Sequence, residues 1–521
     1  MSSVQGAPLV QVQRHGLITL SLMLATIMQV LDTTIANVAL PSMRADLGAS
    51  ADTINWVLTS YIVAAAIATP LTGWLSERFG RREVFIVSTI GFVITSMLCG
   101  IAWNLETMVF FRMTQGLFGA AIVPLSQTFL LDINPPEKHG QAMALWGAGI
   151  MIGPIIGPTL GGYLTETFNW RWVFYINVPL GAVAVAGCLL SLPEMPRRTR
   201  RFDFFGFAAL AIGVGALQLM LDRGGEVDWF NSPEIWIELA IAICGFWVFV
   251  IWILGTEHPF LEPGMFHDRN FSLGLLFIFI VGVILLASLA LLPPMLSGIF
   301  GYPVVTTGLV MAPRGVGTMI TMILAGRLVR VVDPRLLVVV GLLLTAWSLQ
   351  IMTGFGPEMD SHLVVMSGLV QGFGLGLVFV PLSTVAFATI EARYRGDATA
   401  LFSLVRNIGS SIGISIVTLL LTRNTQINHA ELAQKISDMD PNFTALTNGS
   451  LAGAIHAIEQ QHGEGAFWTM VNQIVTQQAS MIGYINDFKA MMWMTLAAIP
   501  LAVFLRRPES RAAPAPAQHI D

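Results

Sequence analysis

The sequence predicts an all-α membrane protein with fourteen spanning helices, arranged as two parallel six-helix halves plus two inserted helices. Of its 521 residues, 54% are hydrophobic and only 11% are charged, whereas soluble domains carry about 25% charged residues. Such a chain cannot cover its surface with polar groups, so most of that surface must face lipid. Apolar stretches of spanning length and an internal repeat carry the rest of the prediction.

Each apolar stretch is long enough to cross a bilayer, which takes about 20 mostly apolar residues. We expect the first stretch to stay in place as a span, because no small-residue cleavage site follows it. The fourteen stretches lie near 17–38, 54–74, 84–103, 106–129, 141–163, 171–192, 204–222, 234–254, 271–296, 305–326, 336–354, 363–388, 398–421 and 487–505.

The distribution of Lys and Arg orients these spans. If the N-terminus is cytoplasmic, 18 of the 27 Lys and Arg residues fall in cytoplasmic segments and six in outer segments or helix ends. The remaining three, Arg112, Arg314 and Arg406, lie within spans. This excess of positive charge follows the positive-inside rule and predicts that both ends of the chain are cytoplasmic.

An acidic residue lies inside the first span, within QVLDTTIANVALP at 29–41. A carboxylate at bilayer depth is costly unless it is paired or hydrated. Asp32 in span 1 and Arg112 in span 4 both lie roughly 9–12 Å below the outer surface, at about 1.5 Å per residue. Opposite charges at one depth predict an ion pair. The pair is either a static bridge or a proton-coupling site, in which changing partners and hydration alter proton affinity.

Other polar residues share this depth or this helix face. Gln29, Thr33, Ala36 and Asn37 lie on the face of span 1 that carries Asp32, and we expect that polar stripe to point inward. Arg406 and Asn407 form a second buried polar pair in span 13. Arg314 in span 10 has no acid at matching depth in span 9. The residues that we expect to line a substrate cavity are Gln29, Asn37, Gln115, Arg406 and Asn407.

An internal repeat divides the chain. GQAMAL at 140–145 recurs as GDATAL at 396–401, a shift of 256, and the Gln-Gly and Pro-Leu pairs at 115–116 and 124–125 recur near the same shift. Eight spans separate equivalent points, so the two copies share one topology and form parallel repeats. We expect a first half at 1–192, a linker with two inserted helices at 193–262, and a second half at 263–521.

Two motifs predict moving parts. GWLSERFGRR at 73–82 has a looser echo in GRLVRVVDPR at 326–335. We expect the first to act as a conformational latch through Gly73, Glu77, Arg78 and Arg81, with Asp333 and Arg335 as its counterpart in the second half. Plain positive-inside anchoring is the alternative, which explains the arginines but not the glycine or the glutamate.

Span 5 reads GAGIMIGPIIGPTLGG, and its glycines recur every four residues. One helix face is therefore bare backbone that can pack closely on a neighbour, while the prolines bend the helix. We expect a seam that serves both as a rigid packing surface and as a surface for rocking. Its residues are Gly153, Pro154, Gly157, Pro158 and Gly161.

The segment at 422–486 is the largest outer one, and it is polar and rich in Gln and Asn. It either docks a periplasmic partner or merely caps the outer face. The spans hold no metal cluster, nucleophile motif or phosphate-binding loop, so we expect neither an enzyme nor a cofactor. The three cysteines have the spacing of neither a metal site nor a disulfide framework.

In combination, several motifs resemble the fourteen-helix drug:proton antiporter family of the major facilitator superfamily, and most closely its EmrB-type inner-membrane exporters. The motifs are LDTTIANVALP at 31–41, GWLSERFGRR, RMTQG at 112–116, GPIIGPTLGG at 153–162, WRWVFYINVPLG at 170–181, LDRGGEVDWF at 221–230 and APRGVGTM at 312–319. The resemblance runs along nearly the whole chain and implies the major facilitator fold.

The resemblance also implies a function. We expect proton-driven export of hydrophobic or amphipathic toxic compounds across a bacterial inner membrane, through a periplasmic adaptor protein and an outer-membrane channel, with no role for nucleic acid. Asp32 and Arg112 match the family's membrane acid and arginine. Asp222 matches another acid of the family, and we therefore add it to the residues expected to line the substrate cavity. The alternative is an exporter of one endogenous metabolite or siderophore.

Overall fold

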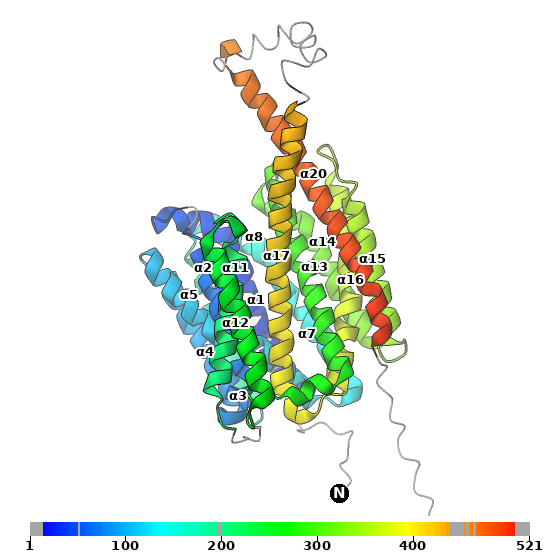
Figure 1. Ribbon diagram of the computed structural model, residues 1–521. Helices are drawn as coiled ribbons and strands as arrows, with labels where there is room; N and C mark the ends of the chain where they lie inside the picture. Colours follow the sequence, from blue (N-terminus) through cyan, green and yellow to red (C-terminus); the bar gives the residue numbers. More distant parts are fainter. Residues whose placement is uncertain are drawn as a thin grey trace, which may run out of the picture.

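The computed structural model describes residues 14–50, 53–195, 197, 200–434, 436, 453, 459–461 and 465–505. Every regular element within these residues is helical (Figure 1). Thirteen helices are long and apolar enough to cross a membrane, or fourteen if one pair bent by 58° counts as one span. The predicted all-α membrane fold is confirmed.

The first six spans are built from ten helices, because several spans are broken. The bent pair α2 and α3 breaks at Pro70, which has no backbone N–H to continue the helix. The helices are α1 (His15–Asp46), α2 (Trp56–Ala68), α3 (Leu71–Phe79), α4 (Arg81–Gly100), α5 (Leu105–Gly119), α6 (Ile122–Ile133), α7 (His139–Ile150), α8 (Ile152–Thr167), α9 (Trp172–Tyr175) and α10 (Asn177–Ser191).

Two inserted helices and six further spans follow. The inserted helices are α11 (Phe204–Arg223) and α12 (Pro233–Gly255). The later spans are α13 (Arg269–Gly298), α14 (Val304–Leu328), α15 (Pro334–Met352), α16 (Ser361–Ala388), α17 (Arg395–Gln434) and α20 (Ala466–Ala498), which η5 (Ile499–Phe504) continues.

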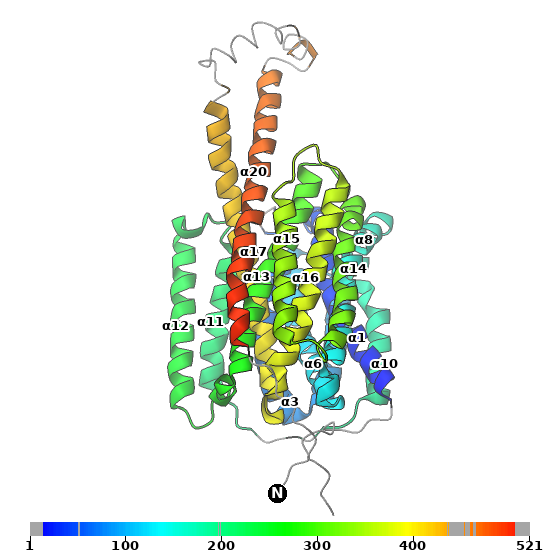
Figure 2. The same cartoon turned by 90° about the vertical axis from the view of Figure 1, so that its right-hand side faces the viewer.

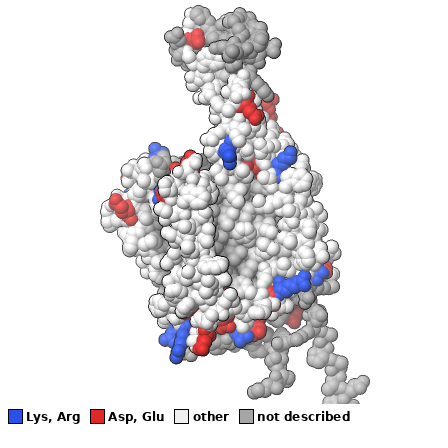
Figure 3. Space-filling model, in the orientation of Figure 1, with Lys and Arg blue, Asp and Glu red and all other residues white. Residues whose placement is uncertain are grey.

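We call the end of the bundle where α1 begins the base, and the opposite end the top. The last described helix also ends at the base (Figure 1). Charged side chains gather near the two ends of the bundle, and the band between them is nearly free of charge on this face (Figure 3). Together with the apolar composition, that band identifies the bilayer-spanning zone of a multi-pass membrane protein.

At the top, α17 and α20 rise side by side well above the other helices (Figures 1 and 2). The outer segment expected at 422–486 is therefore not a loop throughout, because α17 continues to Gln434 and α20 begins at Ala466. The two helices pack on each other, and His429 lies 3.0 Å from the side-chain oxygen of Asn472. Most of 435–465 lies outside the described residues.

The two halves pack against each other mainly near the base. All residues of α6 are buried, and so are residues 396–404 at the base of α17. Thr128 of the first half and Thr399 of the second share a hydrogen bond of 2.7 Å. Further up α17, by contrast, Asn407, Ile414 and Ile416 are exposed. The packing between α6 and α17 is therefore closed at the base, while α8 and α14 keep the halves in contact farther up, where a Cβ atom on Gly308 would lie 2.8 Å from Thr159.

Glycines of the repeated motifs make this close approach possible. A Cβ atom on Gly73 would lie 3.1 Å from the Cα of Asp397, and one on Gly326 would lie 3.0 Å from the carbonyl oxygen of Gly140. The turn motif of each half thus contacts the GxAxAL motif of the other half. This crossed pairing is what a parallel duplication about a central axis produces.

The inserted helices lie on one side of the bundle. α12 is at the edge of the molecule and exposes most of its apolar side chains (Figure 2). α11 contacts both halves, since Gln218 donates to Ser411 at 2.9 Å and Thr59 of α2 donates to Asp222. The insertion therefore bridges the halves through α11 and faces lipid through α12.

Candidate functional site

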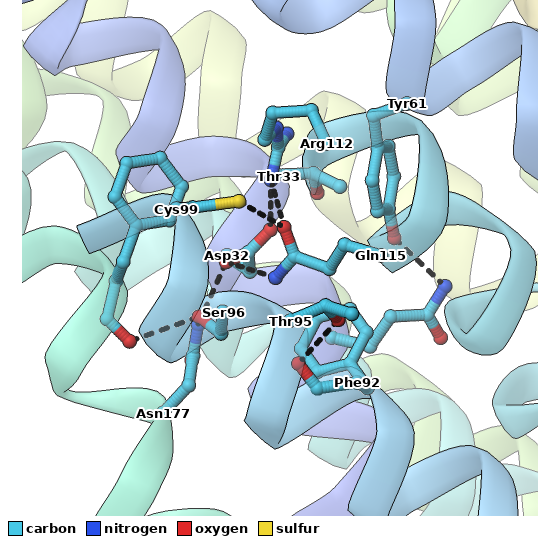
Figure 4. A network of polar contacts seen from close by, with 12 residues as sticks. Asp32, Thr33, Tyr61, Phe92, Thr95, Ser96, Cys99, Arg112, Gln115 and Asn177 are labelled. Atoms are coloured by element: carbon cyan, nitrogen blue, oxygen red, sulfur yellow. Dashed lines mark hydrogen bonds and ion pairs between the residues drawn. The ribbon is translucent and has the colours of Figure 1, made fainter. Parts of the chain in front are cut away.

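Asp32 lies at the centre of a buried polar network (Figure 4). Its Oδ2 accepts a hydrogen bond and ion pair from Arg112 at 2.7 Å. Its Oδ1 accepts hydrogen bonds from Gln115 at 3.1 Å and from Asn177 at 2.7 Å. Three helices, α1, α5 and α10, thus meet at one carboxylate, and the ion pair expected from equal depth is present.

Arg112 is held on every side. Its Nε donates to the carbonyl oxygen of Val57 at 3.1 Å, and its guanidinium carbon lies 4.4 Å from the centre of the Tyr61 ring. The same NH1 that contacts Asp32 also donates to Gln115 at 2.7 Å. Arg112 and Gln115 are three residues apart and therefore share one face of α5. The arginine ties α2 to the network as well.

This geometry fits an ionised Asp32. A carboxylate accepts hydrogen bonds only, and three donors surround this one. Asp32 is 1% exposed and Arg112 is 0% exposed, so neither reaches water in this conformation. Taking up a proton would require Arg112 to move away. The role of Asp32 in proton coupling remains a prediction.

Two members of the network were not predicted. Asn177 also donates to Ser96 at 2.9 Å, and Ser96 donates to the carbonyl oxygen of Phe174 at 2.9 Å. These bonds connect α10 and α4 to Asp32. An amide in the apolar stretch WRWVFYINVPLG and a serine in span 3 were the available signals.

The glycine seam of α8 packs on α1, the helix that carries Asp32. A Cβ atom on Gly153 would lie 2.8 Å from Val30, one on Gly157 2.8 Å from the Cβ of Thr34, and one on Gly161 3.0 Å from Ile35. Thr34 also donates to the carbonyl oxygen of Gly153 at 3.3 Å. Pro154 and Pro158 follow the break between α7 and α8, and neither can donate a backbone hydrogen bond. The seam as a rocking surface remains a prediction.

The residues expected to line a cavity do not form one cluster. Gln115 is 0% exposed, because it belongs to the Asp32 network. Asp222 contacts Thr59 at the interface of α11 with α2. Gln29 donates weakly to the Tyr61 hydroxyl at 3.4 Å, Arg406 is partly buried, and Asn37 and Asn407 are exposed. Gln115 and Asp222 therefore have structural contacts in this conformation rather than free lining positions.

The second half has a related polar cluster. Arg314 of α14 donates to Ser288 of α13 at 2.8 Å, and Gln371 of α16 donates to the same hydroxyl at 3.4 Å. Ser288 and Gln371 each lie 256 residues after Asp32 and Gln115. The position equivalent to Arg112 is Gly368, which packs against the side chain of Arg314. The arginine is thus supplied by a different helix, and a serine replaces the acid.

A second ionic cluster joins the halves at the base. Asp132, at the end of α6, is fully buried and pairs with Arg81 of the first half and, at 3.0 Å, with Arg395 of the second. One carboxylate therefore binds arginines from both halves. Separating the halves would leave Asp132 with only one of them.

Arg200 provides the other link at the base. It pairs with Asp397 of α17 at 2.7 Å and with Glu77 of α3 at 3.5 Å, and it donates to the carbonyl oxygen of Pro259 at 2.9 Å. Burial disfavours the charged guanidinium, but Asp397 and Glu77 outweigh it and raise the pKa of Arg200. Arg200 therefore stays charged and connects both halves to the linker.

A sequence profile described as Major Facilitator Superfamily matches residues 22–414. The chain belongs to that superfamily. It is 37% identical over 498 residues to "Multidrug export protein EmrB" of Escherichia coli (strain K12), covering 94% of this chain and 93% of the relative. It is 36% identical over 494 residues to "Fatty acid resistance protein FarB" of Neisseria gonorrhoeae, covering 94% and 96%.

A solved structure supports the same fold. The human organic anion transporter MFSD10 superposes with a TM-score of 0.56 at 14% identity, covering 92% of this chain and 99% of that one. The sequence and fold matches confirm the predicted major facilitator family and its EmrB-type branch. They make the chain a transporter rather than an enzyme.

In this major facilitator chain, two of the residues predicted to form a latch in the first half make ion pairs with distant segments. Glu77 pairs with Arg200 of the linker, at 3.5 Å, rather than with an arginine of its own turn. Arg81 pairs with Asp132, and Arg78 is exposed with no ion pair among the described residues. The partners of Glu77 and Arg81 come from distant segments that sequence spacing could not connect. The role of this turn as a conformational latch remains a prediction.

Asp333 and Arg335, the predicted counterpart in the second half, make a local contact only. Asp333 caps α15 by accepting a hydrogen bond from the backbone N–H of Arg335 at 3.0 Å. Neither Asp333 nor Arg335 forms an ion pair within the described part of the chain. A short polar residue before a helix is most often such a cap. The role of Asp333 and Arg335 in a latch therefore remains a prediction.

Proposed function

We propose that the chain is a multidrug exporter that drives hydrophobic and amphipathic toxic compounds out of the cell in exchange for protons. Similarity to EmrB over 94% of the chain supports multidrug export. Similarity to FarB, named for fatty acid resistance, supports amphipathic compounds among the cargo. The observation that carries proton coupling is the buried Asp32 carboxylate with its three donors.

Protonation of Asp32 would remove the charge that holds Arg112. The guanidinium would then keep its contacts with Val57 and Gln115 but lose its ion pair. A buried charge that loses its partner is strongly destabilised. Proton entry is thereby linked to a rearrangement of α1, α2, α5 and α10 around this point.

The ion pairs at the base stabilise the conformation in which the two halves are closed there. In this conformation Asp132 and Arg200 hold the halves together at the base. We infer that opening the base separates Arg395 from Asp132 and Asp397 from Arg200, while the seam between α8 and α1 moves as a unit. Alternation between the two arrangements would expose the cargo site to one side at a time.

We also propose that the base is cytoplasmic and that the bacterial inner membrane holds the chain, as the distribution of Lys and Arg indicates. The projecting ends of α17 and α20 would then stand in the periplasm. Their exposed apolar side chains include Ile427, Trp468, Met470 and Ile474. Such a surface supports docking of a periplasmic adaptor protein, and through it an outer-membrane channel.

Reconstitution into liposomes with an imposed pH gradient tests the proposed function. We expect Asp32→Asn to abolish drug-dependent proton flux while leaving the folded yield intact, because Asn keeps the shape but cannot exchange a proton. Asp46→Asn is the matched control, since it makes the same change in the same helix at a residue that accepts a hydrogen bond from Trp170. Unchanged antiport in Asp32→Asn would refute the coupling role.

Docking can be tested separately from transport. Replacing Trp468 and Ile474 by Ser should preserve transport in liposomes but abolish resistance in cells, because the surface proposed to bind the adaptor is then no longer apolar. Retained resistance would exclude this surface. Competition by a single endogenous metabolite, with no competition among drugs, would favour a narrow metabolite or siderophore exporter instead.

A further inference from the structure

Asp487 is a second carboxylate buried within a membrane span. It lies in α20, is 1% exposed, and neither carboxylate oxygen has a hydrogen-bond partner among the described residues. In this respect it is the opposite of Asp32, whose oxygens accept three hydrogen bonds. An ionised carboxylate without donors is strongly unfavourable in such a place. Asp487 is therefore neutral in this conformation and carries its proton.

The surroundings of Asp487 are apolar. Its neighbours on α20, Tyr484 and Phe488, belong to one hydrophobic cluster with residues of α13 and α17. The members of this cluster on α13 and α17 include Ile284, Ala287, Leu291 and Val417. Within the described part of the chain, the carboxylic acid beside this cluster makes no hydrogen bond that would explain its presence by stability. Its use must lie in another charge state or another conformation.

No other titratable group in the packing helices lies at the level of Asp487. Gly483, one turn above it, contacts Leu421 and Thr425 of α17, which places Asp487 beside the turn containing Val417. Tyr484 is the titratable neighbour on α20 itself. The charged or titratable residues elsewhere on α13, α15, α17 and α20 are Arg269, Arg335, Arg395, Asp397, Arg406, Arg423, His429, Glu431 and Lys489.

The top surface is close to Asp487. Arg423 on α17 is exposed and lies between Leu421 and Thr425, at the level of Gly483, which is about one turn or roughly 6 Å above Asp487. On α20, the adjacent Asn486 and the nearby Lys489 are exposed. A proton from the aqueous phase at the top has only a short distance to travel. Asp32, by contrast, is enclosed by three donors and an aromatic ring.

We propose that Asp487 is a second protonation site of the transporter, loaded with a proton from the top in the conformation that is closed at the base. This inference rests on the proposed proton-coupled export and adds a site to it. When the base opens, Asp487 releases its proton to water on the base side and becomes a carboxylate. The buried charge then requires water or new donors, so α20 and α17 must repack around it.

Two sites would give the transporter two protons for each cycle rather than one. α17 carries both the base contact at Asp397 and the contact surface for α20. The charge on Asp487 can therefore influence the same helix that closes the base. Asp32 acts on the first half and Asp487 on the second.

Infrared difference spectroscopy between acidic and alkaline pH tests this site without any drug. We expect the full chain in lipid to show a protonated carboxyl signal that disappears at alkaline pH and is absent from Asp487→Asn. Asn is close in shape to a protonated Asp, so this variant should fold, and Asn486→Ala is the matched control on the exposed neighbour. Spectra of Asp487→Asn and the unmodified chain that agree at every pH would overturn the proposal.

Transport in liposomes gives a second measurement. For a compound that the unmodified chain exports, Asp487→Asn should lower the number of protons exchanged per molecule to about half, since one of two sites remains, and Asp487→Glu should restore it. An unchanged ratio would overturn the proposal. If the unmodified chain moves no protons at all, the proposed function fails, whereas the infrared test of Asp487 still decides the site.

Discussion

The two halves of the molecule differ most where their sequences are most clearly related. In the first half, an arginine, a glutamine and an acid share one buried network. In the second half, the arginine and the glutamine contact Ser288, which replaces the acid. Duplication kept a polar centre in each half, but only the first centre has a carboxylate among its described residues. The difference separates what the fold needs from what the transport chemistry needs.

The glycine seam makes the same distinction. Gly409 and Gly413 lie 256 residues after Gly153 and Gly157, and they pack α17 on α13. A Cβ atom on Gly413 would lie 2.7 Å from the Cα of Val283. The prolines do not recur, since Ser410 and Ile414 stand at the positions equivalent to Pro154 and Pro158. Close packing therefore belongs to both halves, whereas the bend belongs to the first half.

The largest effect should come from removing Arg112 in the first centre. Arg112→Leu leaves Asp32 buried without its cation, which costs about 3–5 kcal/mol. Thermal unfolding of the purified protein should show this loss, and adding Asp32→Asn should restore part of it, because no charge is then left unpaired. Additive losses in the double variant would show that the two residues do not interact.

The second-largest effect should come from changes in the glycine seams of α8 and α17. Gly157→Leu forces a side chain against that of Thr34, and Gly413→Leu forces one against the backbone of Val283. Each change costs roughly 1–3 kcal/mol or more. We expect similar losses of unfolding free energy in the two variants if the seam is a packing surface common to both halves. Gly298→Leu, at a residue with no neighbour within 4 Å of a Cβ atom, is the control. Destabilisation in only one half would contradict a shared seam.

The base network should have a moderate effect on conformation. Arg200→Gln removes ion pairs to both halves and should shift the balance toward an open base by about 1–2 kcal/mol. A cysteine at Thr399, with the native cysteines replaced, should then react about 5–30 times faster with a water-soluble thiol reagent. Arg201→Gln, at an exposed neighbouring arginine, is the control. Equal labelling rates in the two variants would exclude Arg200 from the latch.

The smallest effect should come from giving the second centre an acid. Ser288→Asp places a carboxylate beside Arg314, which already donates to that position at 2.8 Å. We expect the variant to fold with a change in unfolding free energy of about 1 kcal/mol or less, because the added charge has a partner. Severe misfolding would show that the two centres are not equivalent.

Much of this fold was predictable from the sequence because lipid imposes a simple rule on spanning helices. The fourteen spans, the duplication and the Asp32–Arg112 pair follow from apolar length, from repeats and from equal depth. The ends of the last two spans were not predictable in this way, because polar residues of α17 and α20 are held as helix by packing on each other. The last span was expected to start at Asp487. That boundary placed Asp487 at a helix end, so its burial was not predicted.

The base network of ion pairs was the least predictable site. Its acids, Asp132 and Asp397, and its linker arginine, Arg200, come from segments far from the turn motif and become neighbours only when the halves close. The second centre and the second seam could have been found, since the shift of 256 leads directly to Ser288, Gln371, Gly409 and Gly413.

A structure of the base-open conformation tests the central claim most directly. Our account requires Asp32 to give up Arg112 when the halves change their arrangement, so that water can reach the carboxylate. We predict that in this state Asp32 and Arg112 are no longer within hydrogen-bond distance and that Asp32 is hydrated. An Asp32–Arg112 pair that remains at about 2.7 Å and closed to water on both sides would contradict it.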